Sequence, residues 1–149
     1  MSSALYRRLV SAYVDFFSHV SATILLFVSA AIGPYSQAVR AGGFCFISGM
    51  IGLDPSTQKM VDGGVAEQAT QALANLGGVL TECGIGPKQV VKTTVLLTTM
   101  EDYKAVNEVY AEFFKDCEGS YPARAAFAVK GLPANALVEI ESIALDTAS

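Results

Sequence analysis

The chain has 149 residues, a net charge of -4 and a sequence pI of 4.9, and 52% of its residues are hydrophobic while only 16% are charged. This length suits one domain with a sizeable core. So high an apolar share favours an oligomer, in which neighbouring subunits cover part of the surface. The basic residues are scattered and form no stripe, so nucleic-acid binding has little electrostatic support and is not expected.

Residues 1–30 differ in character from the rest. Residues 4–10 predict a short first strand, whereas residues 11–30 hold one carboxylate, no Lys or Arg, and an apolar run at 23–28. Three interpretations stay open for this segment. It is a secretory signal, an organelle-targeting or membrane-anchoring segment, or an insertion without a targeting role. The run is short for a membrane span, which needs about 20 residues, and the absence of an Asn-x-Ser/Thr sequon disfavours secretion.

From residue 31 onward the pattern is regular and predicts one domain, 31–149. Residues 37–40 and 44–48 flank a glycine-containing turn and predict a hairpin. Residues 54–57, with the sequence Asp-Pro-Ser-Thr, predict a further turn.

Two amphipathic helices follow from the spacing of apolar residues. The first begins after Gly63-Gly64 and is stopped by Gly84 and Gly86-Pro87. Its apolar face contains Val65, Ala69, Ala72, Leu73, Leu76, Leu80 and Cys83. The second opens at residues 99–102, which resemble a capping box. Its apolar face contains Tyr103, Val106, Tyr110, Phe113 and Phe114.

Three more strands are predicted at residues 90–97, 124–129 and 137–145, where β-branched and apolar residues gather. The order is therefore β-β-α-β-α-β-β, with an additional N-terminal strand at 4–10. Two helices can cover only one face of such a sheet. The other face stays apolar and needs a partner, which again indicates an oligomer.

A single arginine and a nearby carboxylate are the strongest candidates for chemistry. Arg124 is the only arginine after Arg40, and Glu139 interrupts a run that otherwise reads as a buried strand. Such charges are costly in an apolar setting unless they are paired or used, and Arg can bind a small carboxylate with two parallel hydrogen bonds. The pattern indicates a site for a small anion beside a base. The alternatives are a structural ion pair of Arg124 with Glu139 or Glu141, or edge charges that discourage strand pairing.

Other residue types exclude several kinds of site. Cys45, Cys83 and Cys117 are widely spaced, which predicts reduced, mostly buried thiols without a catalytic part. The only histidine, His19, lies in the N-terminal segment, so residues 31–149 cannot form a Ser-His-Asp or Cys-His machine or a His-ligated metal site. No glycine pair has the spacing of a phosphate loop. We expect no metal, nucleotide or other cofactor.

Several motifs resemble one known family. The nonapeptide at residues 31–39, Ala-Ile-Gly-Pro-Tyr-Ser-Gln-Ala-Val, resembles the opening motif of the reactive-intermediate imine deaminases, the RidA/YjgF/UK114 family. Further matching segments follow in the expected order at residues 47–49, 91–95, 106–110 and 122–143. The resemblance covers about residues 31–145, and more loosely 1–11, and the animal branch is the most similar.

The resemblance implies a chorismate-mutase-like α+β fold, with a sheet that carries two helices on one face. It implies a homotrimer with sites in the clefts between subunits. The implied reaction is hydrolysis of 2-iminobutanoate, 2-iminopropanoate and their enamine tautomers to 2-oxo acids and ammonia. Two alternatives remain: an endoribonuclease that inhibits translation, and a non-catalytic trimer that binds small ligands or acts like a chaperone. We expect a cytoplasmic or mitochondrial protein rather than a secreted one, without a stable membrane span.

The resemblance also implies roles for residues of this chain. Arg124 anchors the substrate carboxylate, Glu139 positions and deprotonates the attacking water, and Tyr35 hydrogen-bonds the carboxylate or the imine nitrogen. Three more residues are expected to bind substrate or brace the site: Ser48, Gly49 and Asn107. Two departures from the family pattern stand out. Residues 11–30 separate the first strand from the Gly-Pro-Tyr motif, and Ala126 stands where some members have Cys, so the site should lack a thiol.

Overall fold

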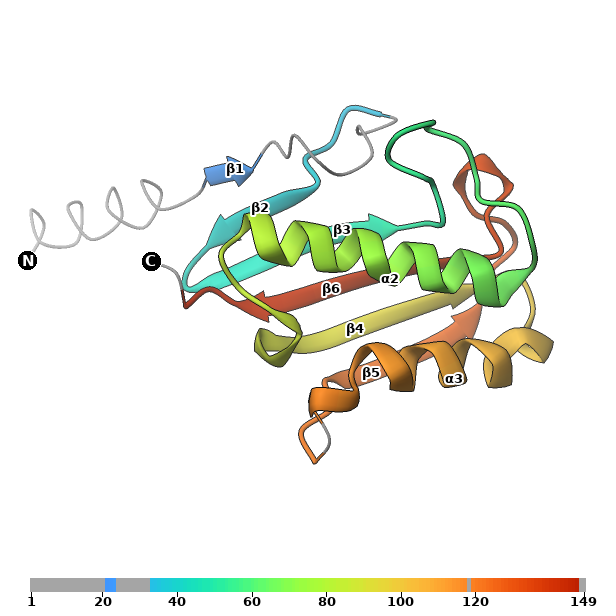
Figure 1. Cartoon of the computed structure of the whole chain (residues 1–149). Helices are drawn as coiled ribbons and strands as arrows, with labels where there is room; N and C mark the ends of the chain where they lie inside the picture. The colour runs from blue at the N-terminus through green and yellow to red at the C-terminus, as the bar shows by residue number, and fades with distance from the viewer. Residues whose placement is uncertain (1–20, 24–32, 118, 148–149) are drawn as a thin grey trace, which may run out of the picture.

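One sheet, covered on one face by two helices, forms the described part of the chain in the computed structural model, which comprises residues 21–23, 33–117 and 119–147 (Figure 1). The strands are β1 (Ser21–Thr23), β2 (Ala38–Ala41), β3 (Phe44–Met50), β4 (Val90–Leu97), β5 (Ala123–Ala128) and β6 (Val138–Leu145). The helices are α2 (Val65–Glu82) and α3 (Tyr103–Phe113). This confirms the α+β architecture with both helices on one face.

The strand order across the sheet is β1-β2-β3-β6-β4-β5. Only β4 and β5 pair in parallel, and every other neighbouring pair is antiparallel. The parallel pair is connected through α3, as a parallel pair requires a crossover. The C-terminal strand β6 therefore lies inside the sheet, between β3 and β4, whereas β5 is an edge strand.

The predicted strands are confirmed with small shifts at their ends. The β2–β3 hairpin turns at Gly42 and Gly43, whose φ angles of 59° and 80° suit glycine. Strand β4 has the predicted bounds, β5 is shifted by one residue at both ends, and β6 begins one residue later than predicted. The strand predicted at residues 4–10 lies outside the described residues. Strand β1, which pairs with β2, lies within the segment 11–30 that we interpreted as an insertion or targeting segment.

Helix α2 packs the predicted apolar face against the sheet. All seven residues predicted for that face are buried. Cys83 caps the helix and Gly84, with φ of 70°, turns the chain away. Asn75 donates hydrogen bonds to the carbonyls of Ile51 and Leu53, at 3.0 and 2.8 Å, which satisfies the backbone of the loop before the helix.

Helix α3 departs from the prediction at its start. Thr99 caps a 3₁₀ turn, Met100–Asp102, by accepting a hydrogen bond from the Glu101 amide, and the α-helix begins only at Tyr103. Tyr103 lies on the same side of the helix as Tyr110, but it is 37% exposed, because it contacts Arg124 at the start of the helix. The remaining predicted residues of this face are buried or half-buried. Within the described residues, neither α-helix has the length and apolar character that a bilayer crossing requires.

The residue register decides which side chains face the helices. Thr93 of β4 pairs with Ser142 of β6 and with Arg124 of β5, and these three side chains share the helix-covered face. Glu139 and Glu141 are offset from Ser142 by odd numbers of residues, so they project from the opposite face, which we call the open face. Glu139 and Glu141 therefore share a face, and Glu139 does not point into the core.

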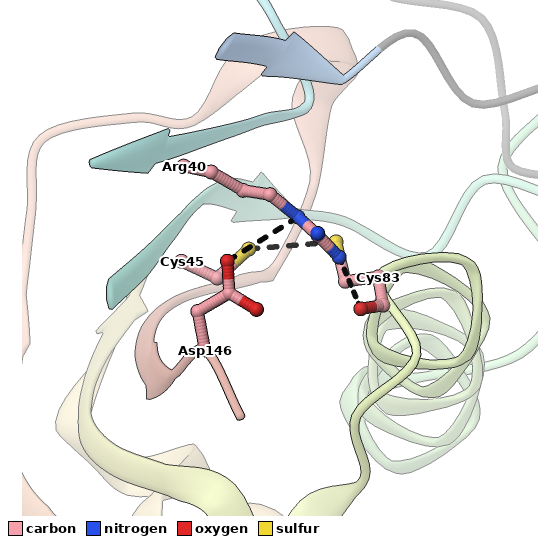
Figure 2. A network of polar contacts seen from close by, with 4 residues as sticks. All are labelled: Arg40, Cys45, Cys83 and Asp146. Atoms are coloured by element: carbon pink, nitrogen blue, oxygen red, sulfur yellow. Dashed lines mark hydrogen bonds and ion pairs between the residues drawn. The ribbon is translucent and has the colours of Figure 1, made fainter. Parts of the chain in front are cut away.

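A half-buried polar cluster joins the first hairpin to the end of α2 (Figure 2). Arg40 donates to the Cys83 carbonyl and forms an ion pair with Asp146, whose Oδ2 lies 3.5 Å from Arg40 Nε. A cation at this place complements the C-terminal end of the helix dipole. Beneath it, the Sγ atoms of Cys45 and Cys83 are 3.4 Å apart. Cys45, Cys83 and Cys117 are free and buried, as predicted.

Candidate active site

Arg124 lies on the edge strand β5 and is turned toward helix α3. Its Cζ is 4.7 Å from the ring centroid of Tyr110 and 5.6 Å from that of Tyr103. Its Nη2 donates to the Tyr103 hydroxyl at 3.2 Å. No carboxylate forms a salt bridge with Arg124 among the described residues. The guanidinium is thus held by aromatic rings and keeps its positive charge available for an anion.

A pocket of about 450 Å³ opens beside this guanidinium. It is lined by Asn107, Tyr110, Ala111, Tyr121, Pro122 and Arg124. The structure thus brings together two of the residues predicted to bind substrate, Arg124 and Asn107. One cation and a few polar groups within an otherwise apolar wall suit a small organic anion.

Glu139 lies on the open face, directly over Gly49 of β3. A Cβ placed on Gly49 would lie 1.8 Å from Oε1 and 2.7 Å from Cγ of Glu139, so only glycine fits there without displacing the carboxylate. The register of β3 against β6 shifts between Ile47 and Met50, which identifies a β-bulge. This bulge presents Ser48 and Gly49 at the place where the carboxylate lies.

The loop that carries Tyr35 is anchored to the same bulge. The Ser48 hydroxyl donates to the Ser36 carbonyl at 2.7 Å, and the Ser48 amide donates to the Gln37 carbonyl at 3.0 Å. Tyr35 itself is 47% exposed, and its amide bonds to the Gly33 carbonyl. Ser48 therefore positions the Gly-Pro-Tyr turn, and its hydroxyl proton is engaged by that turn.

The electrostatic setting of Glu139 favours a base. Burial raises the pKa of the Glu139 carboxyl above its usual value of 4.5, and the neighbouring charge of Glu141 raises the pKa further. Among the described residues, no hydrogen-bond donor or cation contacts the carboxylate. A carboxylate with a raised pKa, whose oxygen atoms accept no hydrogen bond from the described residues, is suited to accept a proton from water.

The proposed residues therefore divide into two groups on opposite faces of the sheet. Arg124 and Asn107 lie on the helix-covered side at the β5 edge. Tyr35, Ser48, Gly49 and Glu139 lie at the β3–β6 bulge, with Glu139 on the open face. The alternative of an ion pair between Arg124 and Glu139 or Glu141 within one chain is wrong, because strand alternation directs these side chains to opposite faces.

The open face is both apolar and hollowed. Four of its large side chains remain between 38% and 48% exposed: Phe44, Phe46, Phe127 and Leu145. A hollow of about 350 Å³ on this face is lined in part by Ser48, Lys92, Thr94 and Glu141. An exposed apolar surface with a polar hollow is typical of a protein–protein contact or ligand site.

Sequence reasoning gave no site role to the two tyrosines that line the Arg124 pocket, Tyr110 and Tyr121, or to Tyr103, which contacts the guanidinium without lining the pocket. Tyr103 and Tyr110 were assigned only to the apolar face of the second helix, and Tyr121, although it lies three residues before Arg124, was given no role. The spacing of Tyr103 and Tyr110 carries a signal, since residues seven apart lie on one helix face. Within residues 33–117 and 119–147, no group of three or more His, Cys, Asp or Glu side chains is placed to bind a metal ion.

Solved structures share this fold. The chain is similar to Escherichia coli TdcF with bound serine, with a TM-score of 0.78 and 34% identity over 84% of this chain and 98% of that one. It is also similar to RidA from a Psychrobacter species, with a TM-score of 0.75 and 39% identity over 80% and 94% of the two chains. The fold is therefore the α+β fold of the RidA/YjgF structures.

Sequence comparison gives the family. The family described as endoribonuclease L-PSP matches residues 27–146. Among curated proteins, the 2-iminobutanoate/2-iminopropanoate deaminase of Mus musculus is 54% identical over 78% of this chain and 84% of its own length. The protein of the same name from Homo sapiens is 50% identical, over 77% and 82%. The chain belongs to the RidA/YjgF/L-PSP family.

Proposed function

We propose that this protein hydrolyses short 2-imino acids, 2-iminobutanoate and 2-iminopropanoate, to the corresponding 2-oxo acids and ammonia. Relatives that carry this activity in their names are 50–54% identical to it over most of both chains. The observation that carries the proposal is the Arg124 guanidinium, which lies in a small pocket without a carboxylate partner among the described residues. It offers the planar pair of donors that a 2-imino acid carboxylate needs.

The proposed reaction uses the chain's own carboxylate as base. Arg124 binds the substrate carboxylate, and Glu139 accepts a proton from water as the oxygen attacks the imine carbon. The imine reacts in its protonated form, so the resulting carbinolamine carries one hydroxyl and one amino group on the same carbon while Glu139 holds the proton taken from water. Glu139 passes that proton to nitrogen and the C–N bond breaks. The Glu139 carboxylate then takes the hydroxyl proton as the C=O bond forms, and that proton leaves with ammonia as ammonium. One water is consumed, and no oxidant or metal is required.

The remaining site residues are proposed to position the reactants. The Tyr35 phenol, exposed near the bulge, hydrogen-bonds the substrate carboxylate or imine nitrogen. Gly49 allows close approach to Glu139, and Ser48 fixes the turn before it. Asn107 lines the Arg124 pocket and orients the bound anion through its side-chain amide.

A complete site requires more than one copy of the chain. Arg124 and Glu139 project from opposite faces, so one molecule cannot direct both at the same small substrate. We propose a homotrimer in which the β5 edge of one subunit meets the open face of the next. The exposed Phe46 and Phe127 of the open face are available to such a contact.

We propose that the protein acts in the cytoplasm or in a mitochondrion. Its three cysteines are free and buried, which suits a reducing compartment. One relative, 46% identical, is the chloroplastic Reactive Intermediate Deaminase A of Arabidopsis thaliana. The intact mass of the protein isolated from its source would show whether residues 1–30 are retained.

The test of the proposed function is a trapping assay. An amino-acid oxidase generates 2-iminobutanoate, semicarbazide traps it, and the deaminase competes with the trap. Wild type should lower semicarbazone formation. The kcat/KM of Arg124→Ala for imine hydrolysis should be at least about 100-fold lower than that of wild type, since the charge-assisted carboxylate contact is lost. A folded oligomer that leaves trapping unchanged would contradict the proposal. The same preparations should be tested for RNA cleavage, which the acidic protein is not expected to catalyse.

A further inference from the structure

Two tyrosines from one helix form a platform under the Arg124 guanidinium. Tyr103 and Tyr110 are seven residues apart, so two turns of α3 place both rings on one side of the helix. Arg124 Cζ lies 5.6 Å from the Tyr103 centroid and 4.7 Å from the Tyr110 centroid. Both distances are within the range of a cation–π contact. A guanidinium held over two rings is restricted in position before any ligand binds.

The Tyr110 ring is itself fixed from beneath. Tyr110 is 5% exposed, and its hydroxyl shares a hydrogen bond of 2.8 Å with the hydroxyl of Thr93, which is fully buried in β4. The ring also packs against Phe114 at a centroid distance of 4.6 Å. The Tyr110 hydroxyl is therefore committed to the core, and only the ring face is presented to Arg124.

The Tyr103 contact is of a different kind. Tyr103 is partly exposed, and its hydroxyl accepts a hydrogen bond from Arg124 Nη2 at 3.2 Å. This contact occupies one of the five guanidinium donors and leaves a pair for a carboxylate. An arginine on an edge strand otherwise loses much rotamer freedom when it binds a ligand. Restricting that freedom beforehand increases affinity without a new contact to the substrate.

We propose that Tyr103 and Tyr110 are positioning residues, which hold the Arg124 guanidinium in the orientation that binds the substrate carboxylate. This inference rests on the proposed function, since it assigns the orientation of the same anion site. The two residues act through Arg124. Their effect falls on substrate and product affinity, because the carboxylate is bound equally before and during the chemical step.

The variants are chosen to separate the two contacts. Tyr103→Phe keeps the ring and removes the hydrogen bond, and it should raise KM about 3- to 10-fold with kcat unchanged. Tyr110→Leu removes the ring and should raise KM more. Tyr110→Phe keeps the ring and removes the Thr93 bond, so it should lower thermal stability more than affinity. Lys104→Gln changes an exposed charge on the same helix and should change neither.

A second readout does not depend on turnover. The affinity for 2-oxobutanoate, measured by calorimetry or by the NMR signal of the Arg124 side chain, should fall by the same factor as KM rises. Matching changes for Tyr103→Phe, with an unchanged melting temperature, would support positioning. Unchanged KM and affinity in both Tyr103→Phe and Tyr110→Leu would overturn it. If wild type binds 2-oxobutanoate but hydrolyses no imine, the proposed function fails while the positioning role remains measurable.

Discussion

Arg124 and Glu139 project from opposite faces of the same sheet, although only one strand, β4, separates the strands that carry them. Thr93 is in register with Arg124 on the helix-covered face, whereas Leu96 is in register with Glu139 on the open face. A substrate of four or five heavy atoms in a chain cannot reach around the sheet. We therefore propose that the hydrolysis uses two half-sites, which lie on separate copies of the chain.

Subunit mixing should restore activity to two inactive variants. Arg124→Ala and Glu139→Gln should each lower activity by about two orders of magnitude or more. After joint unfolding and refolding, mixed oligomers contain interfaces at which an intact Arg124 faces an intact Glu139. Imine hydrolysis should then recover to a fraction of wild type. A mixture as inactive as either parent, with mixed oligomers shown by native mass spectrometry, would place both residues of each site on one chain.

Gly49→Ala should displace the proposed base, Glu139, without changing its chemical identity. The added Cβ would overlap Glu139 Oε1 and Cγ, so the carboxylate must move away from its present place. We expect kcat to fall about 10- to 100-fold, in line with the cost of small misplacements of catalytic groups. Gly131→Ala is the matched control, because a Cβ there meets no atom within 4 Å and should leave kcat unchanged. Equal activity of both variants would show that the position of Glu139 over Gly49 is not required.

The pH dependence should report Glu139 and its neighbour. Burial, and then the Glu141 charge, raise the pKa of the Glu139 carboxyl above 4.5. Because the proposed base must be ionised, kcat should fall as the pH is lowered through that raised pKa. Glu141→Gln removes a like charge, so the pKa of Glu139 should drop and the acid limb should move to lower pH. A pH–rate profile of the two proteins checks this, and an acid limb that stays in place would exclude Glu141 as a cause.

The buried thiol of Cys45 should resist alkylation and make the protein sensitive to base. Burial, and then its hydrogen bond with Cys83, raise the pKa of Cys45 from 9.0 to about 12. At pH 8 the thiolate fraction is then about 10³-fold smaller than in an unfolded chain. Between pH 9 and 12 the folded state binds more protons than the unfolded state, so stability should fall as pH rises. Peptide mapping after iodoacetamide treatment tests the resistance of Cys45 to alkylation, by comparing its labelling in the native protein and in the urea-unfolded protein.

The predicted fall in stability at high pH is checked with a variant that lacks the Cys45 thiol. Cys45→Ala removes the titrating group, so its melting temperature should depend less on pH in this range than that of wild type. Rapid labelling of Cys45 in the folded protein, or an unchanged slope in Cys45→Ala, would contradict the assignment.

Local residue patterns were sufficient for most elements of the fold. Apolar spacing predicted α2 together with its buried face, and a β-branched run predicted β4 with its correct bounds. These signals are local, because a period of 3.6 or 2 residues can be recognised within the segment that forms the helix or strand. The same spacing did not reveal that Tyr103 contacts Arg124 of β5, because that contact joins residues far apart in the chain.

Residue type alone identified the candidate groups, Arg124 and Glu139 in largely apolar strands, because a charge is costly in such a setting. The faces that these side chains occupy, and the groups that surround them, depend on the three-dimensional arrangement of the strands. The sheet order places β5 at an edge and β6 inside, so one strand separates Arg124 from Glu139. The register then directs the two side chains to opposite faces of the sheet. These relations arise from pairings between residues far apart in the chain, and strand alternation turns a one-residue change in register into a change of face.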